Sequence, residues 1–553
     1  MTMPVINFSY SDLCRLLGMQ VSRQTLREKL PMMGADLNSV DEGSDDVSFE
    51  FFPDRPDLYS VEGIARALRA FLGKEIGLKS YPVTRSDLSV LVDPSVDDVR
   101  PFIWTAVVEG NRIDDALIRS MMDLQEKLHI TLGRNRKKVA IGLHDIKEVK
   151  PPFTYKAVRP DEITFMPLQG SREMNLKEIL EEHEKGKAYA FVLDGKDKYP
   201  IILDRDGKVL SFPPIINGIT TAVTENTRDI FVDCTGTDAN AVMAAVNIIA
   251  TALAERGGNI KSVSMQQGGS SASAPNLEPR MMNLEIDYVN HLIGIDLDAK
   301  GMVDCLRRMG YGATSGDDGL QILIPAYRAD IIHPADLAED VAIGYGFDKF
   351  GAELPRKATF GIEDPTIGFS SRVRPILTGL GYLEIVTLSL SNPRDQYEFM
   401  GQPVRDDAIR IMNPVSEDHV QIRTSLIPSI LTMLKKNKHR ELPQRVFEIG
   451  DTVRDHRNVT YLSGASIHAK ASFTECKSDI QSLMTALDLM VTVEKLDNQA
   501  FADGRCASIK HDSGLLGVFG ELAPLTIESF ELGYPIAAFE FDLESIIRAR
   551  ESQ

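Results

Sequence analysis

The sequence has few cysteines and no long apolar run. Its cysteines show neither a CxxC pair nor a Cys/His cluster, so we expect neither a zinc site nor a disulfide framework, and a reducing cytoplasm fits this usage; they stand at Cys14, Cys234, Cys305, Cys476 and Cys506. The longest apolar-rich stretch, residues 241–254, is shorter than the roughly 20 residues of a membrane helix and contains Asn247. The first residues lack the basic and apolar regions of a signal peptide. We therefore expect a cytoplasmic protein with no membrane contact.

The chain also has no excess of basic residues. The chain carries 61 Lys and Arg against 80 Asp and Glu, a net charge of −19, which argues against a protein that wraps nucleic acid over most of its surface. Two short basic runs could make local contacts: GRNRKK at 133–138 and KKNKHR at 435–440. Each such run is more often a solvated charged segment than a phosphate site.

At 553 residues the chain should contain three to five domains. Composition is that of a globular protein, with 43% apolar and 25% charged residues. Segment patterns place the boundaries as follows: a mixed α/β domain at 1–90, an alternating α/β domain at 91–275, a small helical and strand module at 276–355, and a larger domain at 356–553.

Several elements follow from caps and periodicity. Ser11 and Ser60 are expected to cap helices in the first domain. In the second domain, helices are expected at 115–130 and after Asp238, and strands at 187–195 and 228–236. Residues 264–279, rich in Gly, Ser and Pro, are expected to form a linker or an exposed loop.

Residues 327–348 concentrate four carboxylates. Pro334 suits the first turn of a helix that should reach about Ile343, and its buried side should consist of Ile332, Leu337, Val341 and Ile343. On this helix Asp336, Glu339 and Asp340 have the i, i+3, i+4 spacing of one face.

Asp330 could reach that face from the preceding turn. Oxygen donors without His or Cys are the ligands of a hard cation such as Mg²⁺. A solvated acidic face, favoured by the helix dipole, is the other interpretation, and spacing alone does not separate the two.

This run, from Arg328 and Asp330 through the acidic helix to GYGFD at 344–348, resembles the magnesium-linked module of phenylalanyl-tRNA synthetase β subunits of the short archaeal and eukaryotic type. Residues 51–68 and 139–158 resemble other segments of that family. The resemblance implies that Asp330, Asp336, Glu339 and Asp340 are Mg²⁺ ligands. The expected order of elements in residues 276–355 is similar to that of a winged-helix-like module. Such modules often contact nucleic acid, but an acidic helix would repel phosphates, so we expect the metal to bridge subunits.

SFPPIING at 211–218 and FVDCTGTD at 231–238 resemble the family's editing domain, which hydrolyses tRNA(Phe) mischarged with tyrosine. The positions that match its pocket are Leu203, Ser211, Asp233 and Thr235. Asp233 and Thr235 are two residues apart on a strand and share a face. The alternative is that these groups only satisfy a strand end and a turn.

No Ser/His/Asp triad is visible in the sequence. His144 and Asp145 are neighbours on an extended segment and should point to opposite faces, so we expect His144 to be structural. Hydrolysis would then depend on a positioned water and backbone donors.

Residues 413–451 and 504–524 resemble the family's catalytic-like domain, which is related to class II synthetases. Arg445 and Glu448 are similar to the Arg and Glu of the ATP-binding strand in active class II enzymes. A later Gly-rich motif ending in Arg is missing, because the glycines at 514, 517 and 520 are followed by Glu521. Arg is needed there to grip phosphate bidentately. We therefore expect no aminoacylation residues on this chain.

Taken together, the resemblance implies an α+β multidomain protein: an N-terminal mixed domain, an α/β editing-like domain, the winged-helix-like module, and a degenerate class II antiparallel-sheet domain. It implies the β subunit of an α₂β₂ phenylalanine–tRNA ligase that uses ATP and Mg²⁺ and binds tRNA(Phe). Two alternatives are a stand-alone magnesium-dependent hydrolase and a non-enzymatic tRNA-binding scaffold.

Overall fold

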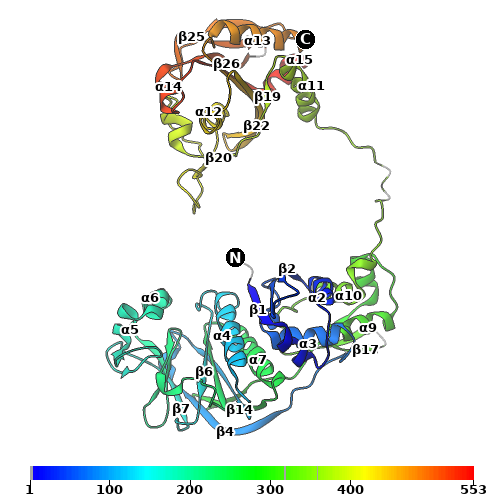
Figure 1. The fold of residues 1–553 in the computed structure, drawn as a ribbon, viewed down its shortest axis with the longest axis vertical. Helices are drawn as coiled ribbons and strands as arrows, with labels where there is room; N and C mark the ends of the chain where they lie inside the picture. Colours follow the sequence, from blue (N-terminus) through cyan, green and yellow to red (C-terminus); the bar gives the residue numbers. More distant parts are fainter. Residues whose placement is uncertain (1–3, 317–318, 356, 358, 513, 553) are drawn as a thin grey trace. The chain divides into compact units, whose positions relative to one another are not determined.

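The computed structural model describes residues 4–316, 319–355, 357, 359–512 and 514–552. The chain divides into two compact units, Met1–Leu354 and Pro355–Gln553 (Figure 1). Both units mix helices and sheets, so the chain is an α+β multidomain protein. Within the described residues, no helix combines the length and apolarity needed to cross a membrane.

The first unit begins with a three-stranded antiparallel sheet of order β1-β3-β2, formed by β1 (Val5–Ser9), β2 (Ala35–Val40) and β3 (Asp46–Phe51), and with helices α1 (Tyr10–Leu17), α2 (Arg23–Met32) and α3 (Val61–Phe71). Ser60 caps α3 as predicted, accepting from the Gly63 N–H at 3.2 Å. The prediction of Ser11 as the cap of α1 is wrong. Ser9 accepts from the Asp12 N–H at 3.1 Å instead, while the Ser11 hydroxyl and N–H both donate to Asp45.

A ten-stranded sheet follows, of order β12-β11-β10-β7-β4-β14-β5-β13-β6, with β15 paired to β14. Its strands are β4 (Val83–Val92), β5 (Phe102–Glu109), β6 (Val139–Asp145), β7 (Phe153–Val158), β10 (Tyr199–Leu203), β11 (Val209–Phe212), β12 (Ile216–Asn217), β13 (Ile230–Gly236), β14 (Asn259–Gln267) and β15 (Ser270–Ala274). A separate pair consists of β8 (Thr164–Phe165) and β9 (Met174–Asn175).

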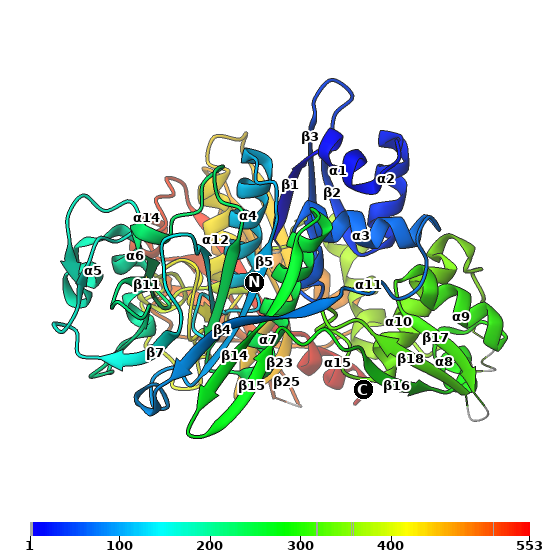
Figure 2. The same cartoon turned by 90° about the horizontal axis from the view of Figure 1, so that it is seen from below.

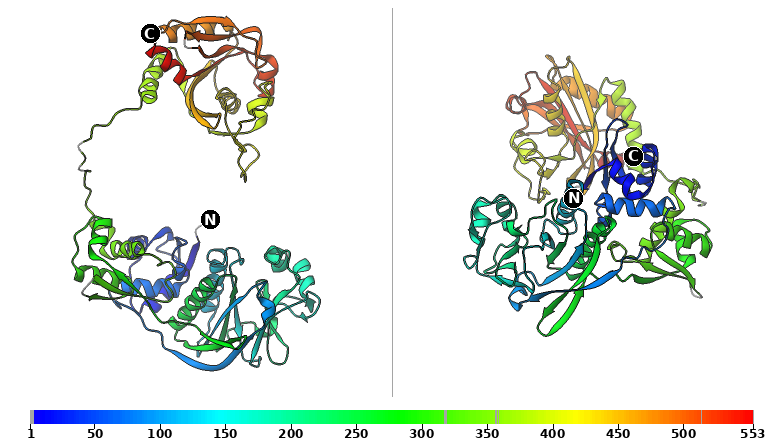
Figure 3. Two further views of the ribbon diagram at one scale, coloured as in Figure 1. Left: turned by 180° about the vertical axis from the view of Figure 1, so that it is seen from behind. Right: turned by 60° about the horizontal axis from the view of Figure 1, so that its bottom comes forward.

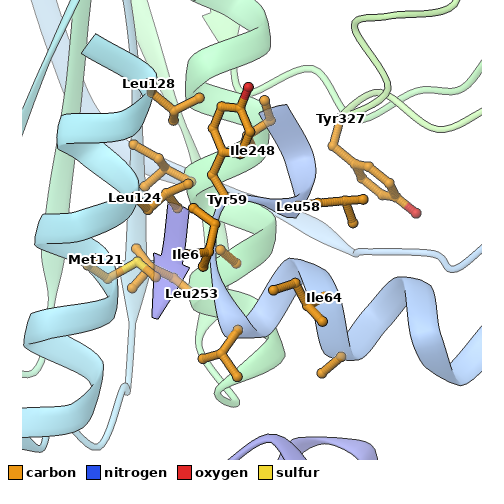
Figure 4. Packing of buried hydrophobic residues seen from close by; sticks show 14 of the residues in the cluster. Ile6, Leu58, Tyr59, Ile64, Met121, Leu124, Leu128, Ile248, Leu253 and Tyr327 are labelled. Carbon is orange, nitrogen blue, oxygen red and sulfur yellow. The ribbon is translucent and has the colours of Figure 1, made fainter. Parts of the chain in front are cut away.

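Two predicted helices pack on this sheet: α4 (Asp115–Ile130) and α7 (Ala239–Glu255), which Asp114 and Asp238 cap. Their apolar faces join α3 in one buried cluster. Figure 4 shows Leu124 of α4, Leu253 of α7 and Tyr59 meeting there. This cluster joins the N-terminal sheet to the large sheet, which fixes the position of the strands that carry the site.

Two expectations in this region are wrong. Residues 187–195 form the end of helix α6 (Glu184–Tyr189) and the 3₁₀ turn η3 (Ala190–Val192), not a strand. A Cβ on Gly186 would lie 1.7 Å from the Ile179 carbonyl oxygen, so glycine lets α6 pack closely on α5 (Leu176–Glu182). The expected linker at 264–279 instead contains the β14–β15 hairpin (Figure 2), because Gly268 and Gly269 adopt the positive φ of a tight hairpin turn.

The last part of this unit is a sheet of order β16-β18-β17 packed with three helices. These elements are β16 (Arg280–Leu284), β17 (Gly312–Gly316), β18 (Gly319–Ile324), α8 (Ile286–Ile293), α9 (Ala299–Arg308) and α10 (Pro334–Tyr345). As predicted, α10 starts at Pro334 and buries Leu337 and Val341. The expectation for Ile332 is wrong: its side chain is 79% exposed, because it lies in the turn before the helix and not on the helical face.

The second unit contains a seven-stranded sheet of order β19-β22-β23-β27-β26-β25-β24 (Figure 3). Its strands are β19 (Leu383–Glu384), β22 (Gln444–Arg454), β23 (Arg457–Ile467), β24 (Thr492–Lys495), β25 (Phe501–His511), β26 (Gly514–Leu522) and β27 (Ile536–Asp542). All neighbours are antiparallel except β19 and β22. A further pair is β20 (Leu390–Ser391) with β21 (Gln421–Ile422).

Helices form a separate apolar cluster with each face of this sheet. The first cluster includes α11 (Pro365–Gly379), α13 (Phe473–Ala486) and α15 (Leu543–Glu551). The second includes α12 (Ile427–Lys436), whose buried Ile427, Ile430, Leu431 and Leu434 were predicted to share a face. The short α14 (Pro524–Ser529) precedes Phe530 of this second cluster.

Candidate functional site

A cavity of about 490 Å³ lies in the first unit, between α4, β6, β11 and the segment that follows β11. Two of the predicted pocket residues, Ser211 and Asp233, line it. Apolar walls come from α4 and β6, while charged groups enter from Glu126, Arg136 and Lys185. The cavity therefore combines an apolar surface with a few polar groups, as ligand sites do.

Asp233 is part of a buried hydrogen-bonded chain. Its Oδ2 lies 2.6 Å from His144 Nε2 and accepts from the Ser211 hydroxyl at 3.4 Å. The other ring nitrogen of His144 lies 2.8 Å from Thr221 Oγ1. His144 is fully buried, and with both nitrogens engaged it fixes the orientation of the Asp233 carboxylate.

The sequence showed no Ser/His/Asp triad, yet the structure brings Ser211, Asp233 and His144 together. As expected, Asp145 is not the partner of His144. The partner is Asp233, which lies on β13, and β13 pairs antiparallel with β6. Asp233 stands between serine and imidazole in this chain, so the order differs from a Ser-His-Asp nucleophile triad. The β6–β13 register brings His144 and Asp233 together. Ser211 comes from β11, near the other end of the strand order, and no local signal reveals either contact.

Gly142 makes room for this chain. Gly142 on β6 pairs with Asp233 on β13. A Cβ at residue 142 would lie 2.2 Å from Asp233 Oδ2 and 2.6 Å from His144 Nε2. Any side chain here would displace the carboxylate, the imidazole or both.

The other two predicted pocket residues lie elsewhere. Thr235 is fully buried and binds Arg100, which donates to its hydroxyl at 2.9 Å and to its carbonyl at 2.7 Å. Burial lowers the pKa of Arg100 to about 10, against the opposing charges of Tyr155 and Asp233. Leu203 packs in an apolar cluster behind β10. The cavity thus receives Ser211 and Asp233, while Thr235 anchors the end of the Asp233 strand.

Arg136 lines the other side of the cavity and packs against Tyr189. Arg136 donates to the carbonyl oxygens of Pro214 and Ile215, at 3.1 and 2.9 Å, and lies 3.9 Å over the Tyr189 ring. Glu126 accepts from Tyr189 at 3.0 Å and from Arg136 at 3.3 Å. These contacts tie the 133–138 loop and α6 to the cavity wall.

The four predicted metal ligands lie on or just before α10, but they differ in their partners. Arg328 donates to Asp330 and to Asp340, each at 2.6 Å, and the Tyr311 hydroxyl also donates to Asp340. The carboxylates of Asp330 and Asp340 raise the pKa of Arg328 well above its usual value although burial opposes them.

This pair of contacts extends into a larger network. Arg55 forms a two-point contact with Asp57 at 2.8 and 3.0 Å, and Arg66 lies 3.8 Å from the same carboxylate. Arg55 also interacts electrostatically with Asp330. Three buried guanidinium groups therefore balance three buried carboxylates between the N-terminal domain and the α10 module.

Asp336 and Glu339 face outward. His333 caps α10, and Asp336 in the first turn completes the capping box by accepting from the Ile332 and His333 N–H groups at 2.7 Å each. Glu339 is exposed, and partial burial, with the charges of Asp340 and Asp54, raises its pKa. Among the described residues, no group of three or more His, Cys, Asp or Glu side chains is arranged to hold a metal ion.

In the second unit, Arg445 and Glu448 both have internal partners. Arg445 forms ion pairs with Glu475 and with Asp479, the latter at 3.5 Å. Glu448 forms an ion pair with Arg423 at 2.8 Å and accepts from the Thr387 hydroxyl at 2.6 Å. The charges that resemble an ATP-binding pair are thus compensated within the domain.

Three family models match successive parts of the chain. Residues 110–262 match the B3/4 domain, residues 282–347 the tRNA synthetase B5 domain, and residues 352–543 the phenylalanyl tRNA synthetase beta chain CLM domain. The cavity lies mainly in the first of these segments, and α10 lies in the second.

Relatives match over the whole length. The phenylalanine–tRNA ligase beta subunit of Archaeoglobus fulgidus is 46% identical, covering 99% of this chain and 100% of the relative. That of Methanothrix thermoacetophila is 45% identical, covering 98% and 100%. A solved N-terminal fragment of the phenylalanyl-tRNA synthetase β subunit of Pyrococcus horikoshii is 40% identical with a TM-score of 0.60, covering 62% of this chain and 99% of the fragment. The chain therefore belongs to the phenylalanine–tRNA ligase beta subunit family, of the short archaeal type.

Proposed function

We propose that this chain works with an α partner, in an α₂β₂ complex, as the β subunit of a phenylalanine–tRNA ligase. The complex joins L-phenylalanine to tRNA(Phe), using ATP and releasing AMP and diphosphate. Full-length similarity to beta subunits of that name, near 45% identity, supports this assignment. The same similarity favours neither a stand-alone hydrolase nor a non-enzymatic scaffold.

Amino-acid activation belongs to the α partner. The supporting observation is that Arg445 and Glu448 are held by ion pairs within their own domain, so neither is free to grip a nucleotide. Phenylalanine-dependent ATP–diphosphate exchange should be absent for this chain alone and present after mixing with the α partner. Exchange by the isolated chain would refute this division of labour.

The cavity in the first unit removes tyrosine from misacylated tRNA(Phe). Editing is needed because an apolar pocket rejects a substrate with one added hydroxyl only weakly. A cavity of about 490 Å³ with apolar walls accommodates an aromatic side chain, and Ser211 and Asp233 place hydrogen-bonding groups inside it. Such a site favours the tyrosyl ester, because the phenylalanyl ester lacks the hydroxyl that those groups can bind.

In the proposed reaction, Asp233 accepts a hydrogen bond from the tyrosine hydroxyl, and His144 holds that carboxylate in place. A water molecule attacks the ester carbonyl carbon, the bond to the ribose oxygen breaks, and the water protons end on the ribose hydroxyl and the carboxyl product before ionisation. Free tyrosine and uncharged tRNA(Phe) result. Backbone N–H groups around the cavity would stabilise the oxyanion.

Deacylation of Tyr-tRNA(Phe) by the assembled complex tests this site. Asp233→Ala should lower kcat/KM for deacylation about 10- to 100-fold, the range of a lost hydrogen bond to a charged group, with phenylalanylation unchanged. Glu181→Ala, which removes an exposed carboxylate on the nearby α5, is the matched control. Full deacylation by Asp233→Ala would remove this carboxylate from the mechanism.

Mg²⁺ is proposed to bind the outer side of α10 through Asp336 and Glu339. Mg²⁺ commonly uses one or two carboxylates and keeps several waters. Partial burial raises the pKa of Glu339, and the charges of Asp340 and Asp54 add to this effect, so the region carries a negative potential. Asp330 and Asp340, which Arg328 already neutralises, would remain behind this pair. When bound, the ion would neutralise the acidic face for contact with the α partner.

A further inference from the structure

The two basic runs of the sequence have different surroundings. The run at 435–440 lies at the end of α12, where Lys435 and Lys438 form ion pairs with Glu531 at 2.8 and 3.7 Å. The run at 133–138 lies beside the cavity, because Arg136 within it binds the Pro214 and Ile215 carbonyls of the cavity wall. The two runs are alike in composition, but only the run at 133–138 lies beside the cavity.

The loop at 133–138 has an uncommon backbone that turns its cations outward. Arg134, Asn135 and Arg136 all adopt positive φ, at 47°, 55° and 65°, a conformation costly for residues other than glycine. Arg136 is buried, whereas Arg134 and Lys137 are exposed. The buried arginine thus anchors a turn that presents the other two charges to solvent.

These charges are available to a ligand. Lys138 pairs with Asp238 at 2.9 Å, but across the described residues no carboxylate forms an ion pair with Arg134, Lys137 or Lys185. Lys185 lines the same cavity as Asp233. Arg134 and Lys137 lie in the same loop as the cavity residue Arg136, and none of the three cations has an acidic partner in the described chain.

An aromatic side chain accompanies them. Phe191 is 41% exposed, the Lys137 Nζ lies 5.2 Å from the centre of its ring, and the Tyr189 ring lies 6.4 Å away. Tyr189 is itself fixed by Glu126 and Arg136. Tyr189 ends α6, which lies beside α5 (Figures 1 and 3). We call Arg134, Lys137, Lys185 and Phe191 the basic rim.

We propose that the basic rim binds the unpaired 3′ end of an aminoacylated tRNA. Exposed aromatic rings stack on bases, and cations that follow the backbone contact phosphates, which together are the features of single-strand RNA sites. Phe191 stacks on a base near the 3′ end, while Arg134, Lys137 and Lys185 contact phosphates. The terminal ribose and its ester then enter the cavity, so this inference rests on the proposed editing function.

Charge-matched variants of the assembled complex test the proposal. The first combines Arg134→Ala, Lys137→Ala and Lys185→Ala; the control combines Lys435→Ala, Lys436→Ala and Arg440→Ala, and removes the same charge. The rim variant should raise KM for Tyr-tRNA(Phe) deacylation at least about 10-fold, and its salt dependence should weaken by a slope of about 2, near 0.7 per lost phosphate contact. Phenylalanylation should be unchanged in both variants.

Phe191 provides a second, uncharged test. Phe191→Ala should raise the same KM about 5- to 100-fold, the range measured for one lost base stack, and Phe191→Tyr should restore it. Equal deacylation by wild type, the rim variant and Phe191→Ala would overturn the proposal while leaving the editing function intact.

RNA binding tests the basic rim separately if the proposed editing activity is absent. If the wild-type complex does not deacylate Tyr-tRNA(Phe), editing is refuted, and affinity for a short single-stranded RNA ending in CCA then decides the rim. Weaker binding by the rim variant and Phe191→Ala than by the control variant supports the RNA site. Equal binding by all of them overturns it.

Discussion

Two groups of buried carboxylates in the first unit differ in what compensates them. Asp233 contacts an imidazole and a hydroxyl, and it lines a cavity. Asp330 and Asp340 contact a guanidinium that also lies near Arg55 and Arg66. The imidazole and the hydroxyl both contact Oδ2 of Asp233, so the other carboxylate oxygen can accept from a ligand, whereas the guanidinium of Arg328 satisfies both Asp330 and Asp340. Partner identity thus separates a candidate binding group from a structural one.

The guanidinium network should be the more costly to break. Arg328→Met would leave Asp330 and Asp340 buried without compensation, and loss of one partner in a buried pair costs about 3–5 kcal/mol. Urea unfolding should show this loss. Arg159→Met is the control, since the Arg159–Asp161 pair is mostly exposed, at 70% and 72%, and such pairs contribute at most about 1 kcal/mol. Equal effects of the two substitutions would contradict the structural role.

Acid should distinguish the two regions, because a guanidinium keeps its charge and an imidazole does not. His129, fully buried next to the cavity wall, accepts from the Ile141 N–H at 2.8 Å, and burial lowers its pKa to about 4. The unfolded chain, with a pKa near 6.5, then binds the proton more readily. Stability should therefore be unaffected above pH 6.5 and fall by about 3 kcal/mol on acidification to pH 4.

The pH dependence of urea unfolding checks this expectation. His129→Gln retains a hydrogen-bond acceptor but no titrating group, so its free energy of unfolding should fall less between pH 6.5 and pH 4 than that of the wild type. Identical pH slopes for the two proteins would show that His129 is not the group that titrates.

The sequence predicts elements that depend on neighbouring residues better than contacts between residues far apart in the chain. Helices α4, α7 and α10 follow from caps and periodicity, which are local. The strand expected at 187–195 failed, because packing of α6 against α5 through Gly186 overrides the apolar pattern. The Gly, Ser and Pro content of residues 264–279 predicted a linker or loop in place of the hairpin at Gly268 and Gly269, although a Gly-Gly pair is itself a turn signal.

The candidate site shows the same limit. Ser211 and Asp233 could be named from the resemblance, but His144 is 89 residues from Asp233 and depends on a strand register that no local pattern specifies. For the acidic helix, the i, i+3, i+4 spacing predicted one shared face, but this is wrong for Asp340, which is buried against Arg328 while Glu339 is exposed. Spacing did not reveal that Arg328 would contact two of the four carboxylates.

Gly142 provides a test of the cavity side. Gly142→Ala places a Cβ 2.2 Å from Asp233 Oδ2, and misplacing a site group by about 1 Å can cost about 100-fold in rate. Deacylation of Tyr-tRNA(Phe) should fall by that order. Gly43→Ala is the control, because no atom lies within 4 Å of its added Cβ. Unchanged deacylation in Gly142→Ala with a folded chain would show that the Asp233–His144 geometry is not needed.

The smallest expected effect concerns the two kinds of carboxylate near α10. Glu339→Gln should weaken Mg²⁺ binding about 10-fold, a change typical of altering a metal's surroundings, and should not lower stability, because the raised pKa of Glu339 shows that its charge is disfavoured in the folded state. Asp330→Asn should do the opposite, lowering stability through Arg328 and leaving the affinity nearly unchanged. Calorimetric Mg²⁺ titration of the assembled complex, with urea unfolding of the same variants, gives both quantities. If both substitutions weaken Mg²⁺ binding equally, Arg328 gives up Asp330 when the ion binds, and the four carboxylates act as one ligand set.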